Sequence, residues 1–250
     1  MVMLRVENLV KRFGGLTVTD ELSLELVPGE LHAVIGPNGA GKTTFINQLS
    51  GEIAPTAGRI LFDGVDITQE PPYRRALMGI GRSYQISSVF RDLTVLQNVA
   101  LAVQAHAGHS FRFWQPVMKQ AALLEPARAA LAQAGLAHMA DMLAADMAHG
   151  ERRQLEMAMT LASSPRLLLL DEPMAGMSHH ESRAVVELLA GLKGKYTTLL
   201  VEHDMDAVFA LADRITVLVY GKVIATGTVD EIRNNAQVSE AYFGSHEEFV

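Results

Sequence analysis

The glycine-rich segment GPNGAGKT at residues 36–43 has the pattern G-x-x-x-x-G-K-[ST]. It follows an apolar, strand-like run at 31–35 and leads into a helix-like stretch. Glycines let successive backbone N–H groups face one anion, and the start of a helix adds a positive end. Lys42 would supply a cation to the β and γ phosphates, Thr43 a hydroxyl to Mg²⁺, and Thr44 a contact with another phosphate. The segment therefore predicts a nucleoside triphosphate site.

Two adjacent carboxylates follow a second apolar run, LLLLDEP at residues 167–173. In a parallel sheet, ligands bind at the carboxyl ends of the strands. Asp171 would hold Mg²⁺ through water, and Glu172 would polarise or deprotonate the water that attacks the γ-phosphate. Taken alone, this pair could be two solvated acids at a strand end. Together with the glycine-rich loop, it predicts a nucleoside triphosphatase.

Three further features narrow the class. Gln85 ends the strand-like run IGRSYQ, and His203 ends the run TTLLVEH. Between them, MAHGERRQLEMAMTLA at residues 147–162 opens a helix at a glycine. Singly, Gln85 would be an ordinary polar strand end and His203 a hydrogen-bonded core histidine.

In this order the motifs resemble the ATP-binding subunits of ABC transporters over nearly all 250 residues. GPNGAGKT resembles Walker A, and LLLLDE resembles Walker B. Gln85 is similar to the Q-loop glutamine and His203 to the switch histidine. MAHGE stands in the place of the LSGGQ signature, which would act in trans on the ATP held by a second subunit.

The resemblance implies ATP and Mg²⁺ as ligands and assigns roles by position. Phe13, in KRFGG, would stack on adenine, and Val18 would line the other side of the base. His203 would bind the γ-phosphate and orient Glu172, while Gln85 would touch Mg²⁺ or the attacking water. The implied catalytic residues are Glu172, His203 and Gln85, and the implied Mg²⁺ contacts are Thr43, Gln85 and Asp171. The implied nucleotide contacts are Phe13, Val18, Asn38, Gly39, Ala40, Gly41, Lys42, Thr43, Thr44, Ala148, His149, Gly150 and Glu151.

Three positions depart from the family pattern. Ala148 stands where the signature usually has serine, and His149 where it often has glycine. The missing hydroxyl removes one hydrogen bond to the γ-phosphate, so we expect slower turnover at the site that this signature closes. His149 resembles the residue found in branched-chain amino-acid-type importers. Ser178, in MAGMS, occupies a position where the D-loop commonly has aspartate, so contacts across the dimer would differ.

Composition excludes several other classes. The formal net charge of −7 argues against a sequence-independent nucleic-acid binder, which normally has a basic excess. The chain has no cysteine, so it has no disulfide, zinc–thiolate site or cysteine nucleophile. The start MVMLRVENLV does not have the pattern of a secretory signal. Apolar runs such as Leu167–Leu170 are far short of the ~20 residues that span a bilayer.

Strand and helix patterns alternate after residue 165, over 166–171, 179–192, 197–202, 205–211 and 215–220. This alternation predicts a mainly parallel sheet covered by helices. Residues 94–143 are rich in Ala, Leu, Gln and Met and favour several helices. We therefore expect a single α/β domain over 1–250. It would be a P-loop NTPase core with an N-terminal antiparallel β-subdomain, a helical insertion at about 86–163 and a C-terminal tail at about 228–250.

Four segments in order resemble one group of this family, the branched-chain amino-acid and related hydrophobic-amino-acid or amide importers. They are KRFGGLTV, RSYQISSVFRDLTVLQNV, SFRFWQP and the tail IRNNAQVSEAYFG. The resemblance implies a second ATPase subunit, identical or homologous, two membrane permeases and, indirectly, a periplasmic solute-binding protein. It places the chain as a peripheral subunit on the cytoplasmic face of the inner membrane. Residues 86–101 would form the groove for a permease helix, or else serve ordinary domain packing.

Other assignments stay open at this point. One is the ATPase of a lipopolysaccharide-export or other ABC system, and another is a soluble ABC regulator of translation or DNA repair. A P-loop kinase is a third, although the signature helix and His203 argue against it. The transported solute would be chosen by the binding protein and the permeases.

Overall fold

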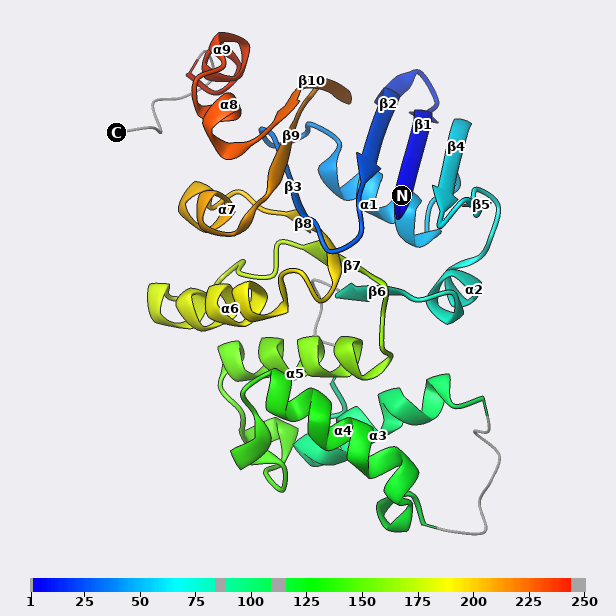
Figure 1. Ribbon diagram of the computed structural model, residues 1–250, viewed down its shortest axis with the longest axis vertical. Coiled ribbons are helices and arrows are strands. Elements are labelled where there is room, and N and C mark those ends of the chain that lie inside the picture. Colours follow the sequence, from blue (N-terminus) through cyan, green and yellow to red (C-terminus); the bar gives the residue numbers. More distant parts are fainter. Residues whose placement is uncertain (1, 84–88, 109–115, 244–250) are drawn as a thin grey trace. The chain divides into compact units, whose positions relative to one another are not determined.

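The computed structural model describes residues 2–83, 89–108 and 116–243 (Figure 1). The chain divides into two compact units. The first comprises Met1–Ile80, Leu167–Glu172 and Leu192–Val250, and the second comprises Gly81–Arg166 and Pro173–Gly191. None of the helices in the described ranges has the length and apolar character needed to cross a membrane.

An antiparallel sheet opens the first unit, with strand order β2-β1-β4-β5. Its strands are β1 (Leu4–Phe13), β2 (Leu16–Leu26), β4 (Ala57–Phe62) and β5 (Val65–Asp66). Alternate residues of β1 and β2 are buried, as expected for a sheet with one face on the core. The register pairs Leu4 with Leu26 and Val6 with Leu24, so the apolar residues of the two strands share one face.

A second, mostly parallel sheet has strand order β10-β9-β3-β8-β7-β6. Its strands are β3 (Leu31–Ile35), β7 (Leu167–Asp171), β8 (Thr197–Val201), β9 (Arg214–Val219), β10 (Lys222–Gly227) and β6 (Ile80–Ser83), whose first residue belongs to the first unit. The pairs β3–β8, β3–β9 and β7–β8 are parallel, whereas β9–β10 is antiparallel. All residues of β3, β7 and β8 are buried, which explains their unbroken apolar sequences.

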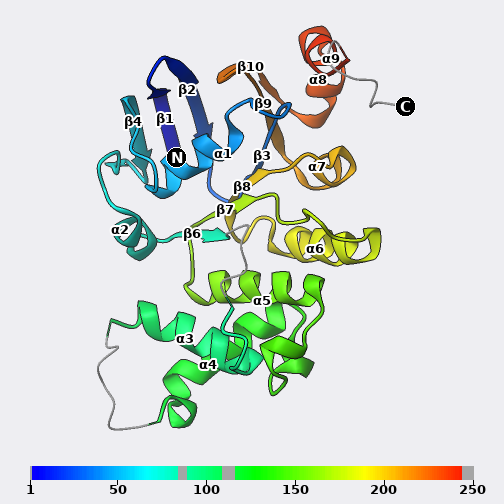
Figure 2. The same ribbon diagram turned by 180° about the vertical axis from the view of Figure 1, so that it is seen from behind.

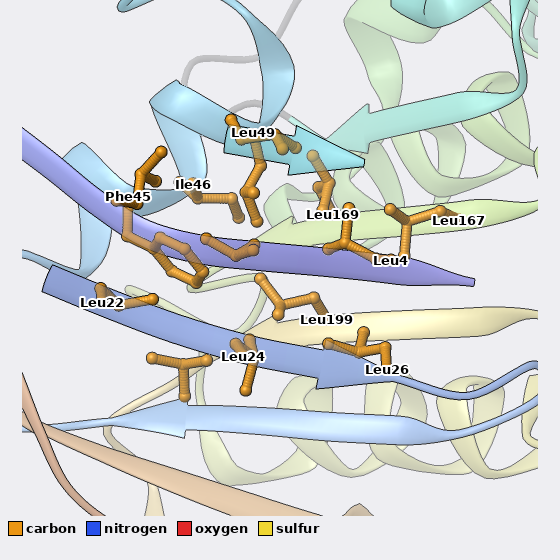
Figure 3. Packing of buried hydrophobic residues seen from close by; sticks show 14 of the residues in the cluster. Leu4, Leu22, Leu24, Leu26, Phe45, Ile46, Leu49, Leu167, Leu169 and Leu199 are labelled. Carbon is orange, nitrogen blue, oxygen red and sulfur yellow. The ribbon is translucent and has the colours of Figure 1, made fainter. Parts of the chain in front are cut away.

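Helix α1 (Lys42–Ser50) packs into the core of the first unit. Figure 3 shows its Phe45, Ile46 and Leu49 in one cluster with leucines of both sheets. The labelled partners are Leu4, Leu22, Leu24 and Leu26 from the antiparallel sheet, and Leu167, Leu169 and Leu199 from the parallel sheet. Burial of three large apolar side chains contributes roughly 1.5–3 kcal/mol each. This packing holds the start of α1 beside the end of β3.

The remaining helices of the first unit are short: α2 (Pro72–Leu77), α7 (Met205–Leu211), α8 (Val229–Arg233) and α9 (Ala236–Phe243). Asp204 caps α7 by accepting the N–H groups of Asp206 and Ala207, both at 3.1 Å. Thr228 and Glu231 form a capping box at the start of α8.

The second unit is helical. It contains α3 (Val95–His106), α4 (Ala121–Gln133) and α5 (His149–Ala162), which contact one another and lie together in both views (Figures 1 and 2). All but the last residue of α6 (His179–Leu192) also belongs to this unit. Thr94 and Gln97 form a capping box at the start of α3, and this capping box determines where the helix begins.

The predicted α/β class is confirmed. Helices α6 and α7 and strand β3 have the predicted bounds, and β8 and β9 differ from them by one residue at one or both ends. The described residues also contain elements that we do not predict, namely α2, β5 and β10. Helix α2 holds the only arginine that is fully buried in the described ranges, Arg75.

Arg75 clamps the carboxyl end of α1. Its Nη1 donates to the carbonyls of Gln48 (2.7 Å) and Leu49 (2.8 Å), Nη2 to Thr68 (3.0 Å) and Nε to Glu70 (2.8 Å). Burial lowers the pKa of Arg75 to about 10, so the group stays charged at neutral pH. A cation at a helix carboxyl end satisfies carbonyls that have no partner within the helix.

We expect Arg75→Met to lower the free energy of unfolding by at least about 3 kcal/mol, because buried carbonyls lose their donors at about 1–3 kcal/mol each. Urea denaturation followed by far-ultraviolet circular dichroism would measure the change. Arg74→Met is the matched control. The side chain of Arg74 is next to Arg75 in the sequence, is 60% exposed and makes one 3.3 Å ion pair with Glu70. Equal unfolding midpoints for the two variants would contradict the clamp.

Candidate functional site

The loop at residues 36–43 joins β3 to α1, and close backbone contacts fix its path. A Cβ atom at Gly36 would lie 2.1 Å from the carbonyl oxygen of Leu218, and one at Gly41 would lie 2.5 Å from that of Val18. Gly41, which precedes α1, also has φ of 99°, a conformation that favours glycine. The amide of Gly221 donates to the carbonyl of Ala40 at 3.0 Å and ties the loop to the turn between β9 and β10.

The loop leaves several of the predicted phosphate contacts accessible. Asn38, Gly39 and Thr43 are exposed and Thr44 is half-buried, while Ala40 is buried. Among the residues that the structure describes, no side chain caps the start of α1, so its first amide groups have no side-chain acceptor from this part of the chain. An anion bound at this point would satisfy these amides and the positive end of the helix. The geometry fits a phosphate group.

Lys42 is buried and its ammonium group folds back onto the loop. Nζ donates to the carbonyl of Gly36 at 2.6 Å and to that of Pro37 at 3.1 Å. Burial lowers the pKa of Lys42 from its ordinary value, and the charges of Glu172 and Asp171 act in the opposite direction. The predicted cation and the two predicted carboxylates therefore share one electrostatic environment.

Both carboxylates lie where β7 ends. Asp171 is 2% exposed and pairs in register with Val201 of β8. Glu172 is half-buried, has φ of 47°, and donates its amide hydrogen to the carbonyl of Val201 at 2.8 Å. A non-glycine residue in this left-handed conformation is uncommon and is typical of turns and functional sites. The turn directs the chain away from the sheet directly after Asp171.

His203 lies at the end of the neighbouring strand β8. Its side chain is 64% exposed, and its Nδ1 is 3.6 Å from Oε2 of Glu202. Glu202 is fully buried and the same Oε2 accepts the amide hydrogen of His203 at 3.0 Å. Glu202 is not among the residues predicted from the sequence, although a carboxylate directly before a histidine at a strand end is a signal that could have indicated it. This residue fixes the backbone from which His203 projects.

Phe13 and Val18 belong to the hairpin of β1 and β2. Phe13 is 48% exposed, and Nζ of Lys11 lies 5.0 Å from the centroid of its ring. Nζ of Lys11 also donates to the carbonyl of Ala54 at 2.8 Å, which holds the cation over the ring. Val18 reaches the loop, since its carbonyl oxygen is the atom that a Cβ at Gly41 would meet. The hairpin therefore contacts the glycine-rich loop through Val18 and carries an accessible aromatic ring in the same unit.

The predicted signature residues lie in the second unit, at the start of α5. Ala148 and His149 are exposed, Gly150 is buried and Glu151 is half-buried. The amide of Ala148 donates to Oε2 of Glu151 at 2.7 Å, and the amide of Gly150 donates to Oε1 of Glu181 at 3.0 Å. Ala148 has no side-chain oxygen with which to cap α5, so carboxylates from positions 151 and 181 take the two amides.

Gln85 and residues 86–88 lie outside the described residues, as do 109–115 and 244–250. Within the described part of the chain, His, Cys, Asp and Glu side chains form no group of three that could hold a metal ion. Of the predicted Mg²⁺ contacts, Thr43 and Asp171 lie among the described residues and Gln85 does not.

Comparison with known proteins gives two family matches. A family model for ABC transporters matches residues 19–175, and a model described as branched-chain amino acid ATP-binding cassette transporter matches residues 222–248. The chain is 39% identical to the high-affinity branched-chain amino acid transport ATP-binding protein LivG of Escherichia coli strain K12, over 97% of this chain and 98% of that protein.

Two further relatives broaden the comparison. The lipopolysaccharide export system ATP-binding protein LptB of Haemophilus influenzae is 32% identical over 98% of each chain. The crystal structure of an ATP-binding cassette of an ABC transporter in its ADP conformation matches with a TM-score of 0.86 and 30% identity, over 98% of this chain and 99% of that chain.

We expect Phe13→Ala to raise the KM for ATP about 5- to 150-fold with little change in kcat, because stacking of a base on an aromatic ring contributes roughly 1–3 kcal/mol. Steady-state ATPase assays over a range of ATP concentrations would measure the change. Leu16→Ala is the control, since Leu16 is 65% exposed on the same hairpin. A parental KM in the Phe13 variant would contradict the role of the ring.

Proposed function

This chain belongs to the ABC transporter family of ATP-binding proteins, and on that premise we propose that it energises an importer of branched-chain or related hydrophobic amino acids. ATP is its substrate and hydrolysis of ATP is its reaction. The observation that carries the choice of importer is the match of residues 222–248 to the branched-chain model, because these residues lie outside the general ABC match at 19–175. In the structure this segment begins with β10 and continues through α8 and α9.

The residues of the first unit supply the chemistry in this proposal. Lys42 and the amides at the start of α1 hold the β and γ phosphates, and Glu172 accepts a proton from the attacking water. His203 hydrogen-bonds the γ-phosphate and orients Glu172. A Mg²⁺ ion held by Thr43, Asp171 and Gln85 would neutralise charge on the phosphate oxygens.

A second ATPase subunit completes each site. The signature residues 148–151 of one subunit close over the triphosphate bound by the other, and the amides of α5 face that phosphate. Loss of the γ-phosphate removes the group that bridges the two subunits, so the subunits separate and the attached permeases change the side of the membrane to which they open.

The transport partners complete the proposal. Each permease packs a helix against the segment 86–101, and a periplasmic solute-binding protein delivers the solute. The chain lies on the cytoplasmic face of the inner membrane as a peripheral subunit and has no nucleic-acid partner.

Lipopolysaccharide export is the second candidate, favoured by the 32% identity to LptB over 98% of the chain. It predicts permease partners that handle a lipid and need no solute-binding protein. The description of the C-terminal match and the higher identity to LivG, 39%, favour the importer.

We expect Glu172→Gln to lower the ATPase rate about 10²- to 10⁴-fold, because it removes the general base, while ATP binding persists and closed dimers accumulate. The ATPase rate and the dimer fraction would be measured on the chain purified with its companion ATPase. Glu25→Gln on β2 is the charge-matched control, since Glu25 is a surface residue paired with Arg5. A parental rate in the Glu172 variant would show that another group is the base.

The same variant tests the solute. Cells that lack their own branched-chain uptake and express the complete transporter should take up labelled leucine, and the Glu172→Gln subunit should abolish that uptake. Parental protein that hydrolyses ATP without uptake of leucine, isoleucine or valine would contradict the proposed solute class and leave the ATPase assignment intact.

We expect Ala148→Ser to raise the ATPase rate by up to about 10-fold, because the added hydroxyl can donate a charge-assisted hydrogen bond to the γ-phosphate. The rate would be compared in assembled complexes. Ala162→Ser adds the same hydroxyl at the other end of α5 and should leave the rate unchanged. An unchanged rate in the Ala148 variant would show that the amides and the helix end suffice.

A further inference from the structure

Glu181, in the first turn of α6, bridges two segments with its two carboxylate oxygens. Oε2 accepts the amide hydrogen of Ser178 at 2.9 Å and its hydroxyl hydrogen at 2.7 Å. Oε1 accepts the amide hydrogen of Gly150 at 3.0 Å. Ser178 immediately precedes α6, and Gly150 is the second residue of α5, 31 positions before Glu181 in the sequence. All three residues belong to the second unit.

The contact depends on glycine at position 150. A Cβ atom there would lie 2.9 Å from both Cγ and Oε1 of Glu181. Any side chain at this position would therefore displace the carboxylate from the amide. Glycine at this position therefore leaves room for a second group to lie close to the backbone amide.

The charge of Glu181 matches that of a phosphate oxygen. Hydrogen bonds from the hydroxyl and amide of Ser178, followed by that from the amide of Gly150, hold the pKa of Glu181 below its ordinary value. The carboxylate is therefore ionised at neutral pH, and His149 next to Gly150 adds a favourable charge interaction when protonated. An anion at the amino end of the 14-residue helix α5 is also favoured by the helix dipole.

We propose that Glu181 is a positioning residue that occupies the Gly150 amide in the absence of ATP and gives it up to the γ-phosphate of the partner's nucleotide when the two subunits close. This inference rests on the proposed function, in which residues 148–151 bind that phosphate. Two anions cannot share one amide donor without strong repulsion, so the carboxylate and the phosphate compete. ATP must displace Glu181, and this displacement reduces the apparent affinity for ATP.

The exchange also links the signature to the segment 174–178. Because Ser178 holds Oε2 by two hydrogen bonds, the carboxylate stays attached to the start of α6 after it leaves Gly150. Loss of the contact with Gly150 therefore removes the hydrogen bond that ties Ser178 and Glu181 to the start of α5. In this way the arrival of phosphate at α5 is communicated to the segment that directly follows Glu172 and Pro173.

Glu181→Gln tests the competition, because glutamine has the same shape and can still accept from Ser178 but has no charge. We expect the KM for ATP of the assembled complex to fall about 3- to 10-fold with kcat within about twofold of the parental value. Glu187→Gln, an exposed residue of the same helix, is the matched control for the change in net charge and should leave KM unchanged. A purely structural cap would lower the urea unfolding midpoint without moving KM.

Glu181→Asp provides a second, independent variant. It retains the charge and the position in the first turn of α6, but is one methylene shorter and does not reach Gly150, so KM should fall as in the glutamine variant. A KM that is unchanged or raised in both variants would overturn the inference. Parental protein that neither binds nor hydrolyses ATP would instead overturn the proposed function, so the two failures are distinguishable.

Discussion

Burial of α1 between the two sheets of the first unit is the constraint on which the rest of the site depends. Phe45, Ile46 and Leu49 anchor the helix to leucines of both sheets. Arg75 secures its carboxyl end through four carbonyls, two of them belonging to α1. The amino end of the helix is left for a ligand. A helix fixed in this way can present its first amides to a phosphate without reorganising when the phosphate binds.

The charged groups near the start of this helix come from the loop and from the ends of two strands. Lys42 is buried and bonded to the loop that it belongs to, while Asp171 and Glu172 balance part of the cost of burying its charge. Glu202 lies at the end of the next strand and holds the amide of His203, so the histidine ring projects from a fixed backbone and stays 64% exposed. Parallel pairing of β3, β7 and β8 brings their carboxyl ends to one edge of the sheet. The sheet therefore collects cation, carboxylates and histidine from sequence positions that are far apart.

The amino end of α5, in the second unit, differs from that of α1. At α1 no side chain within the described ranges caps the helix, whereas at α5 the carboxylates of Glu151 and Glu181 accept the amide hydrogens of Ala148 and Gly150. The same physical preference, an anion at a helix amino end, is therefore satisfied from within the chain at one place and reserved for a ligand at the other.

Local sequence determined much of the fold and most of the candidate site. Unbroken apolar runs marked β3, β7 and β8, the glycine-rich pattern marked the loop before α1, and the positions of Asp171, Glu172 and His203 followed from the strand ends. Only the tertiary structure decided which charged residues are buried. Nothing in PPYRRAL distinguishes Arg75 from the exposed Arg74, because the carbonyls that bind Arg75 come from α1 and from the segment between β5 and α2. Likewise the carboxylate of Glu181 finds the amide of Gly150 only through the packing of two helices. Periodicity and motif spacing report local conformation, whereas the partner of a side chain depends on where distant segments of the backbone meet.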